Sequence, residues 1–487
     1  MSKITKVVLV QPYYENIWEP IGLGYIAGYL KKFFKGKIDI SCYQGNFDTD
    51  EEIIEACIGA DVVGYSCTSP AWPHALRIAK VLKEKSPNTR NVFGGFHPSA
   101  LPRECIKYDQ VDQIVIGEGE IAFCDIVSGK TDPIVFGEKL SMQDLPWPDR
   151  QIIKNHRTVS LCESMNGLRI ASFQCNRVCP VNCAFCAERI VSGRFNRKTN
   201  PIRSRDVSEM CDEIEHVIKE LDINYFKFVD ATFDINPQFV IDFCKEKINR
   251  GITTEWECLI HCSFTTDEMF MWLKKSGCHQ VNMGVESGSD QILRDIGKGL
   301  NVKRVKQAFG WAKKWGIERR GFFLFGMPNE TRADLLLTEQ LIDEIRPDVV
   351  GFTILCPYPG TALYKPEMND IIDWEKADEY SNDYWSTEHF TNAELKAQQA
   401  YFKTKYDLML CDRLVGDSEV ADTSQFTGFK DMRDLEKSST GTPMGANVNN
   451  EFDKDSDRDS DFSKKNRLNS KSNQAKSYAK MKEKFNK

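Results

Sequence analysis

The first third of the chain alternates short apolar runs with amphipathic stretches. The apolar runs, which have the length and composition of buried strands, are residues 4–10, 61–66, 91–95 and 113–116. Residues 21–34 and 74–85, between these runs, repeat apolar side chains at helical spacing. Strands that alternate with helices are typical of parallel, doubly wound sheets, so we expect a Rossmann-like (flavodoxin-like) α/β domain over residues 1–145.

The same alternation returns beyond about residue 165. Six apolar runs, each followed by a stretch of helical periodicity, are residues 168–173, 225–229, 254–259, 280–285, 321–325 and 349–355. These strand–helix units predict a second α/β domain, which we place at residues 146–365.

The pattern fades after residue 365. Residues 392–409 have the pattern of an amphipathic helix capped by Thr391 or Asn392, and this helical segment, residues 366–415, could cover the mouth of the second domain. Residues 416–487 are rich in Ser, Asp, Lys and Asn and cannot bury enough apolar surface to fold. We expect a disordered polyampholyte tail there, with a docking segment for a partner as the alternative.

Composition and charge narrow the class of protein. The chain has 487 residues, 17 of them cysteine, and a net charge of −7. Its N-terminus has only the short apolar run 7–10, and no apolar stretch approaches the ~20 residues that a membrane helix needs. We therefore expect a cytoplasmic protein with reduced thiols and no membrane span. The net charge shows no excess of Lys and Arg of the kind that binds nucleic acid, so a small-molecule or peptide substrate is expected.

The cysteines carry the strongest chemical signal. Cys179, Cys183 and Cys186 stand in a C-x3-C-x2-C pattern. Three thiolates on one short loop can each reach a different iron of a [4Fe–4S] cluster, which leaves the fourth iron open to a substrate or cofactor. A zinc site and unligated core cysteines are the alternatives. Cys175 lies outside the pattern and is expected to pack beside the ligands rather than to bind iron.

The flanks of the motif, FQCNRVCPVNCAFCAERI, sharpen this hypothesis. Arg177 and Pro180 bracket the first ligand, and Phe185 precedes the last. This pattern resembles the radical S-adenosylmethionine (SAM) enzymes, which bind SAM at the open iron. The resemblance implies that the second domain is a partial (β/α)6 TIM barrel, whose chemistry lies at the carboxyl ends of its strands.

The same resemblance implies a SAM site at those strand ends. Asp230 follows the second strand, where a carboxylate could pair with the ammonium of SAM. Glu286 and Ser287, in the phrase GVESGS, follow the fourth strand and are expected near the ribose or the amino acid of SAM, with the glycines allowing close backbone approach. Gly326 begins the turn GMPNET on the adenine side. His261 at the end of the third strand could contact substrate.

The loops of the first domain fit a second cofactor. The cobalamin domain of methionine synthase and of B12 mutases has the pattern D-x-H-x-x-G, then S-x-L, then G-G. Ile17 stands where its aspartate would be, and Glu19 where its histidine would be, so the usual histidine below the cobalt is absent. The remaining positions that match this pattern in spacing are Gly22, Ser66, Thr68, Gly94 and Gly95.

The first domain resembles the N-terminal domain of cobalamin-dependent (class B-like) radical SAM enzymes more closely. The matching phrases are EPIGLGYIAGYL, FGGFHPSALP, IGEGE and DLPWPDR. This subfamily often lacks the histidine. The resemblance adds Gln11, His97 and Glu118 to the expected cofactor contacts, although His97 could equally be a hydrogen-bonded loop histidine. A generic flavodoxin-like domain is the alternative.

Together these resemblances imply an enzyme with three cofactors, a [4Fe–4S] cluster, SAM and cobalamin. The expected activity is methyl transfer from SAM, through methylcobalamin, to an unactivated carbon or to phosphorus, with a reductant such as flavodoxin or ferredoxin as electron donor. The cofactors carry the hard chemistry, and the protein aims it. Two alternatives stay open, a non-methylating cyclisation, rearrangement or oxidation, and a cobalamin- or redox-responsive binding protein.

Overall fold

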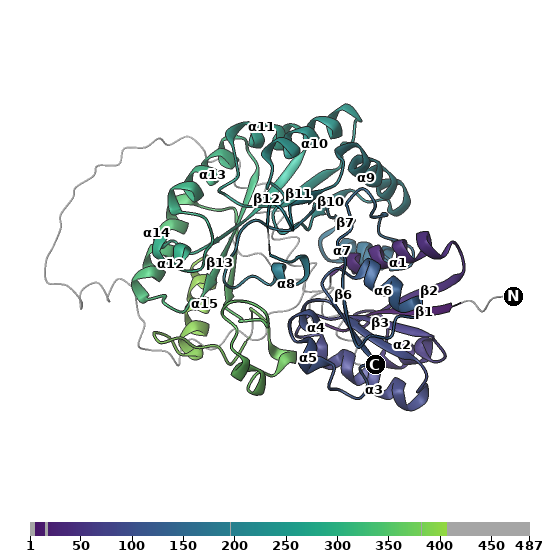
Figure 1. Ribbon diagram of the computed structural model, residues 1–487. Coiled ribbons are helices and arrows are strands. Elements are labelled where there is room, and N and C mark those ends of the chain that lie inside the picture. The colour runs from purple at the N-terminus through teal and green to yellow at the C-terminus, as the bar shows by residue number, and fades with distance from the viewer. Residues whose placement is uncertain (1–4, 15–17, 195, 381, 407–487) are drawn as a thin grey trace, which may run out of the picture.

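The computed structural model describes residues 5–14, 18–194, 196–380 and 382–406. The tail predicted from residue 416, the predicted helix beyond residue 406, and Ile17 lie outside the described residues. The described part contains two six-stranded sheets, one at each side of Figure 1, and the two-stranded ladder β8–β9.

The first sheet is parallel and has the order β2-β1-β3-β4-β5-β6. Side chains of β1 alternate between two apolar clusters: Val8 and Val10 pack towards α2 and α3, and Val7 and Leu9 towards α1 and α6. Helices therefore cover both faces, which confirms the doubly wound prediction. The elements are β1 (Thr5–Gln11), α1 (Ile21–Phe34), β2 (Ile38–Gln44), α2 (Asp50–Cys57), β3 (Val62–Ser66), α3 (Trp72–Lys85), β4 (Arg90–Gly94), α4 (Phe96–Ala100), α5 (Pro102–Cys105), β5 (Gln113–Ile116), α6 (Gly119–Val127) and β6 (Ile134–Phe136).

The pattern missed both edge strands of this sheet. β2 has the sequence IDISCYQ, in which polar residues interrupt the apolar ones, and β6 has only three residues. An edge strand has one neighbour and tolerates polar positions, so its sequence signal is weak.

The second sheet follows chain order, β14-β13-β12-β11-β10-β7, and every pair is parallel. Helices line its outer side in Figure 1, which confirms the partial (β/α)6 barrel. The elements are α7 (His156–Asn166), β7 (Ile170–Phe173), β8 (Asn176–Arg177), α8 (Glu188–Ser192), β9 (Arg203–Ser204), α9 (Val207–Leu221), β10 (Tyr225–Phe228), α10 (Pro237–Asn249), β11 (Glu255–Ile260), α11 (Asp267–Lys275), β12 (Cys278–Glu286), α12 (Asp290–Asp295), α13 (Val302–Lys314), β13 (Glu318–Phe325), α14 (Arg332–Ile345) and β14 (Val349–Ile354).

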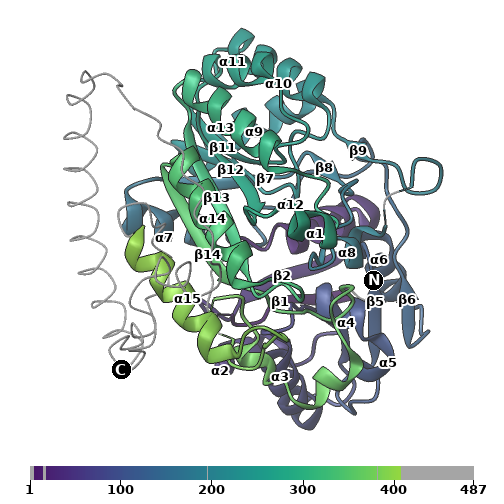
Figure 2. The ribbon, with the colours of Figure 1, turned by 90° about the vertical axis from the view of Figure 1, so that its left-hand side faces the viewer.

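The C-terminal helix α15 (Asn392–Lys405) starts at the predicted cap, Thr391, whose side chain accepts a hydrogen bond from Glu394 N. It does not cover the barrel mouth, however. Gln399 Nε2 donates to Phe352 O at 2.9 Å, and the helix lies along β14 next to α14 (Figure 2). Its apolar side chains join the barrel core, because β14 is an edge strand whose outer face needs cover.

The segment that joins the sheets packs tightly against both. Asp149 N donates to Gly24 O at 2.9 Å, and a Cβ added at Gly28 would lie only 2.6 Å from Trp147 O, so α1 needs glycine there. Towards the barrel, Arg150 Nη2 lies 3.0 Å from Glu213 Oε1, and both side chains are buried. The predicted boundary at residues 145 and 146 falls within this segment.

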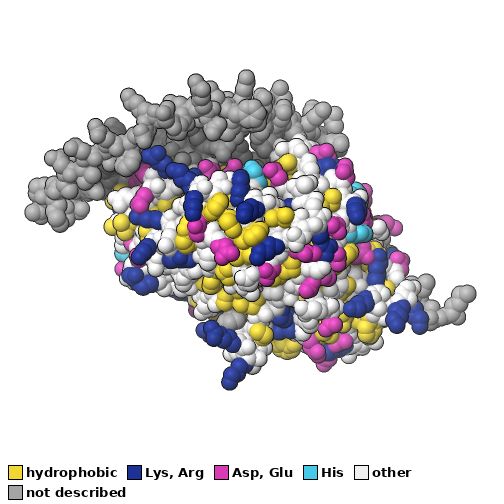
Figure 3. Space-filling view, turned by 90° about the horizontal axis from the view of Figure 1, so that it is seen from above, with side chains coloured by type: hydrophobic (Ala, Val, Ile, Leu, Met, Phe, Trp, Pro, Cys, Tyr) yellow, Lys and Arg dark blue, Asp and Glu magenta, His cyan; other side chains and the backbone are white. Residues whose placement is uncertain are grey.

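The surface is mixed in charge. On the face seen in Figure 3, Lys and Arg side chains stand among Asp and Glu without a large area of one sign. None of the helices in the described ranges is long and apolar enough to cross a bilayer.

Candidate functional site

The cysteine loop leaves the barrel directly after β7. Cys175 is fully buried, β8 follows at once, and Val178 adopts φ +79°, a left-handed conformation that is unusual for a β-branched residue. The loop returns to the barrel at Ala184, whose N–H donates to Ile296 O at 2.8 Å. Both ends of the loop are thus fixed on the carboxyl side of the sheet.

The three motif thiols share this loop but differ in their surroundings. Burial raises the pKa of Cys183 to about 12 and that of Cys186 to about 11, while the Lys298 ammonium acts in the opposite direction on both. Cys179 Sγ lies 3.4 Å from Thr232 Oγ1. In the ranges that the structure describes, no three His, Cys, Asp or Glu side chains are grouped closely enough to share one metal ion.

Cys175 has a structural partner, as predicted for a residue outside the motif. Its N–H donates to Asp230 Oδ1 at 3.1 Å, its Sγ lies 3.4 Å from the same oxygen, and Asn176 N also donates to it. Burial raises the pKa of Asp230 to about 7. Asp230 therefore anchors the start of the cysteine loop, and its expected contact with the SAM ammonium stays a prediction.

An ion pair next to the cysteines was missing from the sequence-based prediction. Lys298 Nζ lies 2.7 Å from Glu286 Oε1, with both residues buried, and 5.8 Å from the centre of the Phe185 ring. Burial alone would lower the pKa of Lys298, but Glu286 and Cys183 raise it above its ordinary value. The only local signal was Lys298 between two glycines, both at positive φ, in the phrase IGKG.

The GVESGS and GMPNET phrases make contacts within the protein, and their expected contacts with SAM stay predictions. Ser287 is fully buried, and its Oγ lies 3.4 Å from Thr338 Oγ1. A Cβ at Gly288 would lie 2.3 Å from Leu337 O, so this glycine allows α14 to approach, rather than a ligand. Gly326, at φ +83°, accepts a hydrogen bond from Trp385 Nε1 at 2.7 Å and packs against the C-terminal segment.

His261 supports the lysine turn rather than facing open space. The ring Nε2 of His261 lies 2.9 Å from Lys298 O, and its backbone N–H donates to Asp234 Oδ1. Burial lowers the pKa of the ring to about 4. The neutral imidazole thus holds the turn that carries Lys298.

On the first sheet, the ends of β3 and β4 form a close backbone contact. Gly95 has φ +93°, and a Cβ there would lie 2.7 Å from Cys67 O. Thr68 Oγ1, next in the chain, is buried and has no hydrogen-bond partner among the described residues. A buried hydroxyl without a partner usually has a ligand or water beside it, so this atom is a candidate cofactor contact.

His97 matches the alternative of a hydrogen-bonded loop histidine. Its Nδ1 lies 3.1 Å from Ser69 Oγ, and its ring stacks on Trp72 and meets Trp374 edge-on, each at 5.1 Å between centroids. Burial lowers its pKa to about 3, so the ring is neutral.

The remaining predicted contacts of the first domain are Gln11, Ser66, Gly94, Glu19 and Gly22. Gln11 and Ser66 end β1 and β3, and Gly94 ends β4. Glu19 Oε1 accepts a hydrogen bond from Asn155 Nδ2 at 2.5 Å. A Cβ at Gly22 would meet no atom within 4 Å, so the protein itself places no steric demand on that glycine.

Glu118 forms ion pairs with two arginines of the barrel domain. It pairs with Arg177 at 2.7 Å and also with Arg203, and Glu120 pairs with Arg177 at 2.5 Å. Glu118 thus forms ion pairs between the two domains, and its expected contact with a cofactor stays a prediction.

A cavity of about 210 Å³ lies between the two domains and is partly open to solvent. Thr68, Ser69 and Pro70 line it from the end of β3, and Ala187, adjacent to Cys186, lines it from the cysteine loop. Its aromatic walls are Tyr14, Trp18, Phe96, Tyr358 and Tyr380. Mostly apolar cavities with few polar groups are typical of sites for cofactors and organic substrates.

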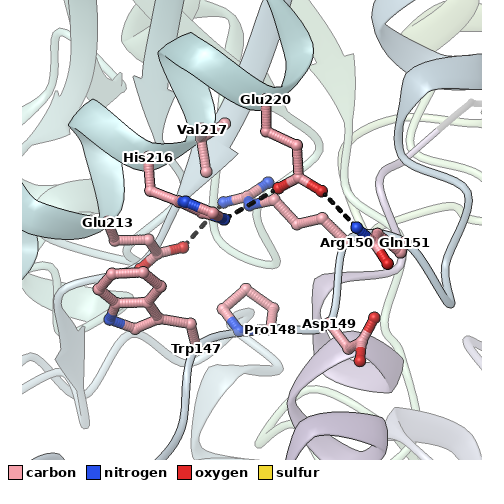
Figure 4. A pocket seen from close by; sticks show the side chains of 9 residues that line it. All are labelled: Trp147, Pro148, Asp149, Arg150, Gln151, Glu213, His216, Val217 and Glu220. Atoms are coloured by element: carbon pink, nitrogen blue, oxygen red, sulfur yellow. Dashed lines mark hydrogen bonds and ion pairs between the residues drawn. The ribbon is translucent and has the colours of Figure 1, made fainter.

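A second crevice, between the linker and α9, has a different character (Figure 4). Arg150 and Glu213 face each other there, Gln151 donates to Glu220 at 3.1 Å, and His216 also pairs with Glu220. These polar groups have partners within the protein, so the crevice belongs to the packing of the linker.

Comparisons with known proteins agree with this division of the chain. The model of the B12 binding domain matches residues 7–127, and the model of the radical SAM superfamily matches residues 174–342. An uncharacterized methyltransferase of Pyrococcus horikoshii is 27% identical over 77% of this chain and 86% of its own. The anaerobic magnesium-protoporphyrin IX monomethyl ester cyclase of Rubrivivax gelatinosus is 25% identical over 76% of this chain and 72% of its own.

A solved structure shares the fold. The radical SAM methyltransferase TsrM from Kitasatospora setae, with cobalamin and a [4Fe–4S] cluster bound, superposes with a TM-score of 0.60. The match covers 74% of this chain and 77% of TsrM at 16% identity, which supports the arrangement of the elements and no more.

Proposed function

We propose that this protein is a cobalamin-dependent methyltransferase. The chain belongs to the radical SAM superfamily and carries a B12-binding domain before the barrel. It would move a methyl group from SAM through cobalamin to an unactivated carbon, or to phosphorus, of a small-molecule or peptide substrate. The observation that carries this proposal is the cavity lined by both Thr68 and Ala187, since one space adjoins the ligand edge of the first sheet and the cysteine loop.

The residues present fit the cofactors that the two domains imply. Cys179, Cys183 and Cys186 supply three thiolates for the [4Fe–4S] cluster, and they share one loop. On the cobalamin side, the unpartnered Thr68 hydroxyl and the glycine-dependent contact at Gly95 form an edge that the backbone can bring close to a ligand. When bound, the cluster supplies electrons to SAM and cobalamin carries the methyl group.

The chain's own side chains would bind and orient SAM. The Glu286–Lys298 pair lies beside Cys183 and Cys186, so it offers a carboxylate and an ammonium to the charged amino-acid end of SAM. Lys298 also favours the thiolate form of the cysteines that bind iron. The Phe185 ring, with its centre 5.8 Å from Lys298 Nζ, lies beside this pair.

The names of relatives support methylation and also favour one alternative. The relative from Pyrococcus horikoshii is named as a methyltransferase, while the one from Rubrivivax gelatinosus is a cyclase of similar identity. A cobalamin-binding radical SAM enzyme with a non-methylating reaction is therefore the second candidate. With either reaction we propose a reductant such as flavodoxin or ferredoxin, a cytoplasmic location and no nucleic-acid partner.

Two measurements test the proposal. Protein purified without oxygen from cells supplied with cobalamin is treated with cyanide, and the cyanocobalamin released is expected to approach one equivalent per polypeptide. No release, with an intact iron–sulfur absorbance, would refute cobalamin-dependent methylation. With candidate substrates, S-adenosylhomocysteine formed together with a methylated product supports methylation, whereas 5′-deoxyadenosine and a product without a new methyl group would establish the second candidate.

A further inference from the structure

Four buried charges connect the first domain to the cysteine loop. Glu118 and Glu120, at the carboxyl end of β5, contact Arg177 and Arg203 of the β8–β9 ladder. The side chains are 4%, 5%, 10% and 13% exposed, in that order, and their formal charges cancel. We call these four residues the quartet. Removing one partner of a buried ion pair leaves an uncompensated charge, which is strongly destabilising. The positions of these four side chains therefore depend on one another.

The ladder depends on the glutamates. Arg177 and Arg203 lie directly opposite each other in a ladder of two residues per strand, and like charges in that arrangement repel. Glu118 Oε2 accepts hydrogen bonds from both arginines, at 2.7 and 3.0 Å. One carboxylate of the first domain therefore allows the two strands of the barrel domain to pair.

The ladder in turn fixes the first iron ligand. Val178 follows Arg177, is 2% exposed, and holds φ +79°, and Cys179 comes next. A strained backbone persists only where its surroundings determine it fully. Val178 thus adopts this conformation between Arg177, which the glutamates hold, and Cys179.

The glutamate turn also belongs to the ligand edge of the first sheet. Gly117 N donates to Ser99 Oγ at 3.1 Å, and a Cβ at Gly137 would overlap Glu118 O, so the turn is packed from both sides. We infer that the quartet is a positioning device, which sets the cluster loop at a fixed place relative to cobalamin. This inference rests on the proposed function, because it requires both cofactors.

The test measures the geometry without any substrate. The cofactor-loaded protein is prepared with cobalt in its paramagnetic +2 state and with the cluster reduced, and pulsed EPR records the dipolar coupling between them. Glu118→Gln keeps the shape and removes the charge, and we expect the coupling to change by about half or to broaden beyond measurement, with cobalamin and iron contents unchanged. Glu118→Asp is expected to give a smaller change.

Asp48→Asn is the matched control. Asp48 pairs with Arg157 at 2.7 Å between the same two domains but away from the cysteine loop, so this variant should keep the coupling of the parent protein. Parent-like coupling in both Glu118→Gln and Glu120→Gln would overturn the inference. An equal change in Asp48→Asn would overturn it too, because any loosening of the interface would then suffice.

A variant that does not load its cluster is still informative. In the cofactor-free chain, amide hydrogen exchange over residues 175–179 should rise in Glu118→Gln while β10–β14 keep their protection, and unchanged exchange there would overturn the inference. Failure of the proposed function has a different signature. A parent protein that couples both cofactors but never methylates refutes methylation and leaves the quartet intact, and a parent protein without cobalamin refutes both.

Discussion

Cys175 and Cys179 show how surroundings separate two cysteines of one loop. Cys175 Sγ lies against a buried carboxylate that also binds the backbone on either side of it. Cys179 is partly exposed, and its described contact is a hydroxyl. A thiol that binds iron must be reachable and able to lose its proton, and burial beside an anion opposes both.

We therefore expect different outcomes from alanine at these positions. Cys179→Ala, Cys183→Ala and Cys186→Ala should lose the iron–sulfur absorbance and the reductive cleavage of SAM. Cys175→Ala should keep iron and lose about 1 kcal/mol of stability, since Asp230 retains its backbone donors. Iron content and 5′-deoxyadenosine formation check this prediction. Iron loss in Cys175→Ala equal to that in Cys179→Ala would contradict it.

His97 gives a prediction about pH. The pKa of His97 in the folded protein is about 3, below its ordinary value of 6.5. Between pH 3 and pH 6.5 the ring is therefore protonated in the unfolded chain and neutral in the folded one. This residue's contribution to stability is thus complete above about pH 6.5 and falls by about 1 kcal/mol per pH unit below it. Denaturant midpoints at about pH 7.5 and about pH 5.5 should differ less in His97→Asn. An equal difference in both proteins would contradict the assignment.

At the scale of elements, the close contact between the ends of β3 and β4 requires a glycine at position 95. Gly95 combines a positive φ with a distance of 2.7 Å between its would-be Cβ and a carbonyl oxygen, whereas Gly22 sits in α1 with open space around it. Both glycines match the cobalamin pattern, yet only at Gly95 do contacts within the protein require a glycine.

This contrast separates folding from ligand contact. Gly95→Ala should cost about 2–4 kcal/mol through strain and overlap, and Gly22→Ala should stabilise α1 by up to about 1 kcal/mol. Unfolding midpoints of the cofactor-free proteins measure both effects. If Gly22→Ala folds normally but binds less cobalamin, Gly22 makes room for the ligand. A stable Gly95→Ala protein would contradict the argument.

At the scale of the whole molecule, residues 355–380 connect the barrel back to the first domain. Trp374 meets His97 edge-on, Tyr14 OH donates to Asp378 Oδ2 at 2.5 Å, and Arg77 pairs with Glu375. Tyr358 and Tyr380 of the same segment line the cavity between the domains. The segment therefore forms the third wall of that cavity.

Weakening the contacts between this segment and the first domain should speed the release of cobalamin. Trp374→Ala removes the aromatic contact with His97 of the first domain, worth about 1 kcal/mol, so we expect release to become about three- to tenfold faster. Ile371→Ala, a neighbour with 70% exposure, is the control and should behave as the parent. Absorbance after dilution of the loaded protein measures the rate. Equal rates in all three proteins would show that this segment does not retain the cofactor.

The sequence predicted what depends on local pattern. The cysteine spacing, the apolar runs of both sheets and the Thr391 cap lie within short stretches of chain, and the structure contains those strands and that cap. The pattern could not predict that Lys298 turns back to Glu286, or that Glu118 crosses to Arg177, because each depends on how distant segments pack. The position of α15 likewise depends on which sheet edge is left uncovered, a property of the finished barrel.

The packed linker has a consequence for turnover. Asp149 is bonded to α1, Arg150 is buried against α9, and the quartet holds the opposite side of the interface, so the two domains should move as one body. An enzyme built in this way cannot bind and release its small molecules by separating its two domains. Small molecules are then expected to pass residues 355–380 in each catalytic cycle, and the rate at which this segment opens would set an upper limit on turnover.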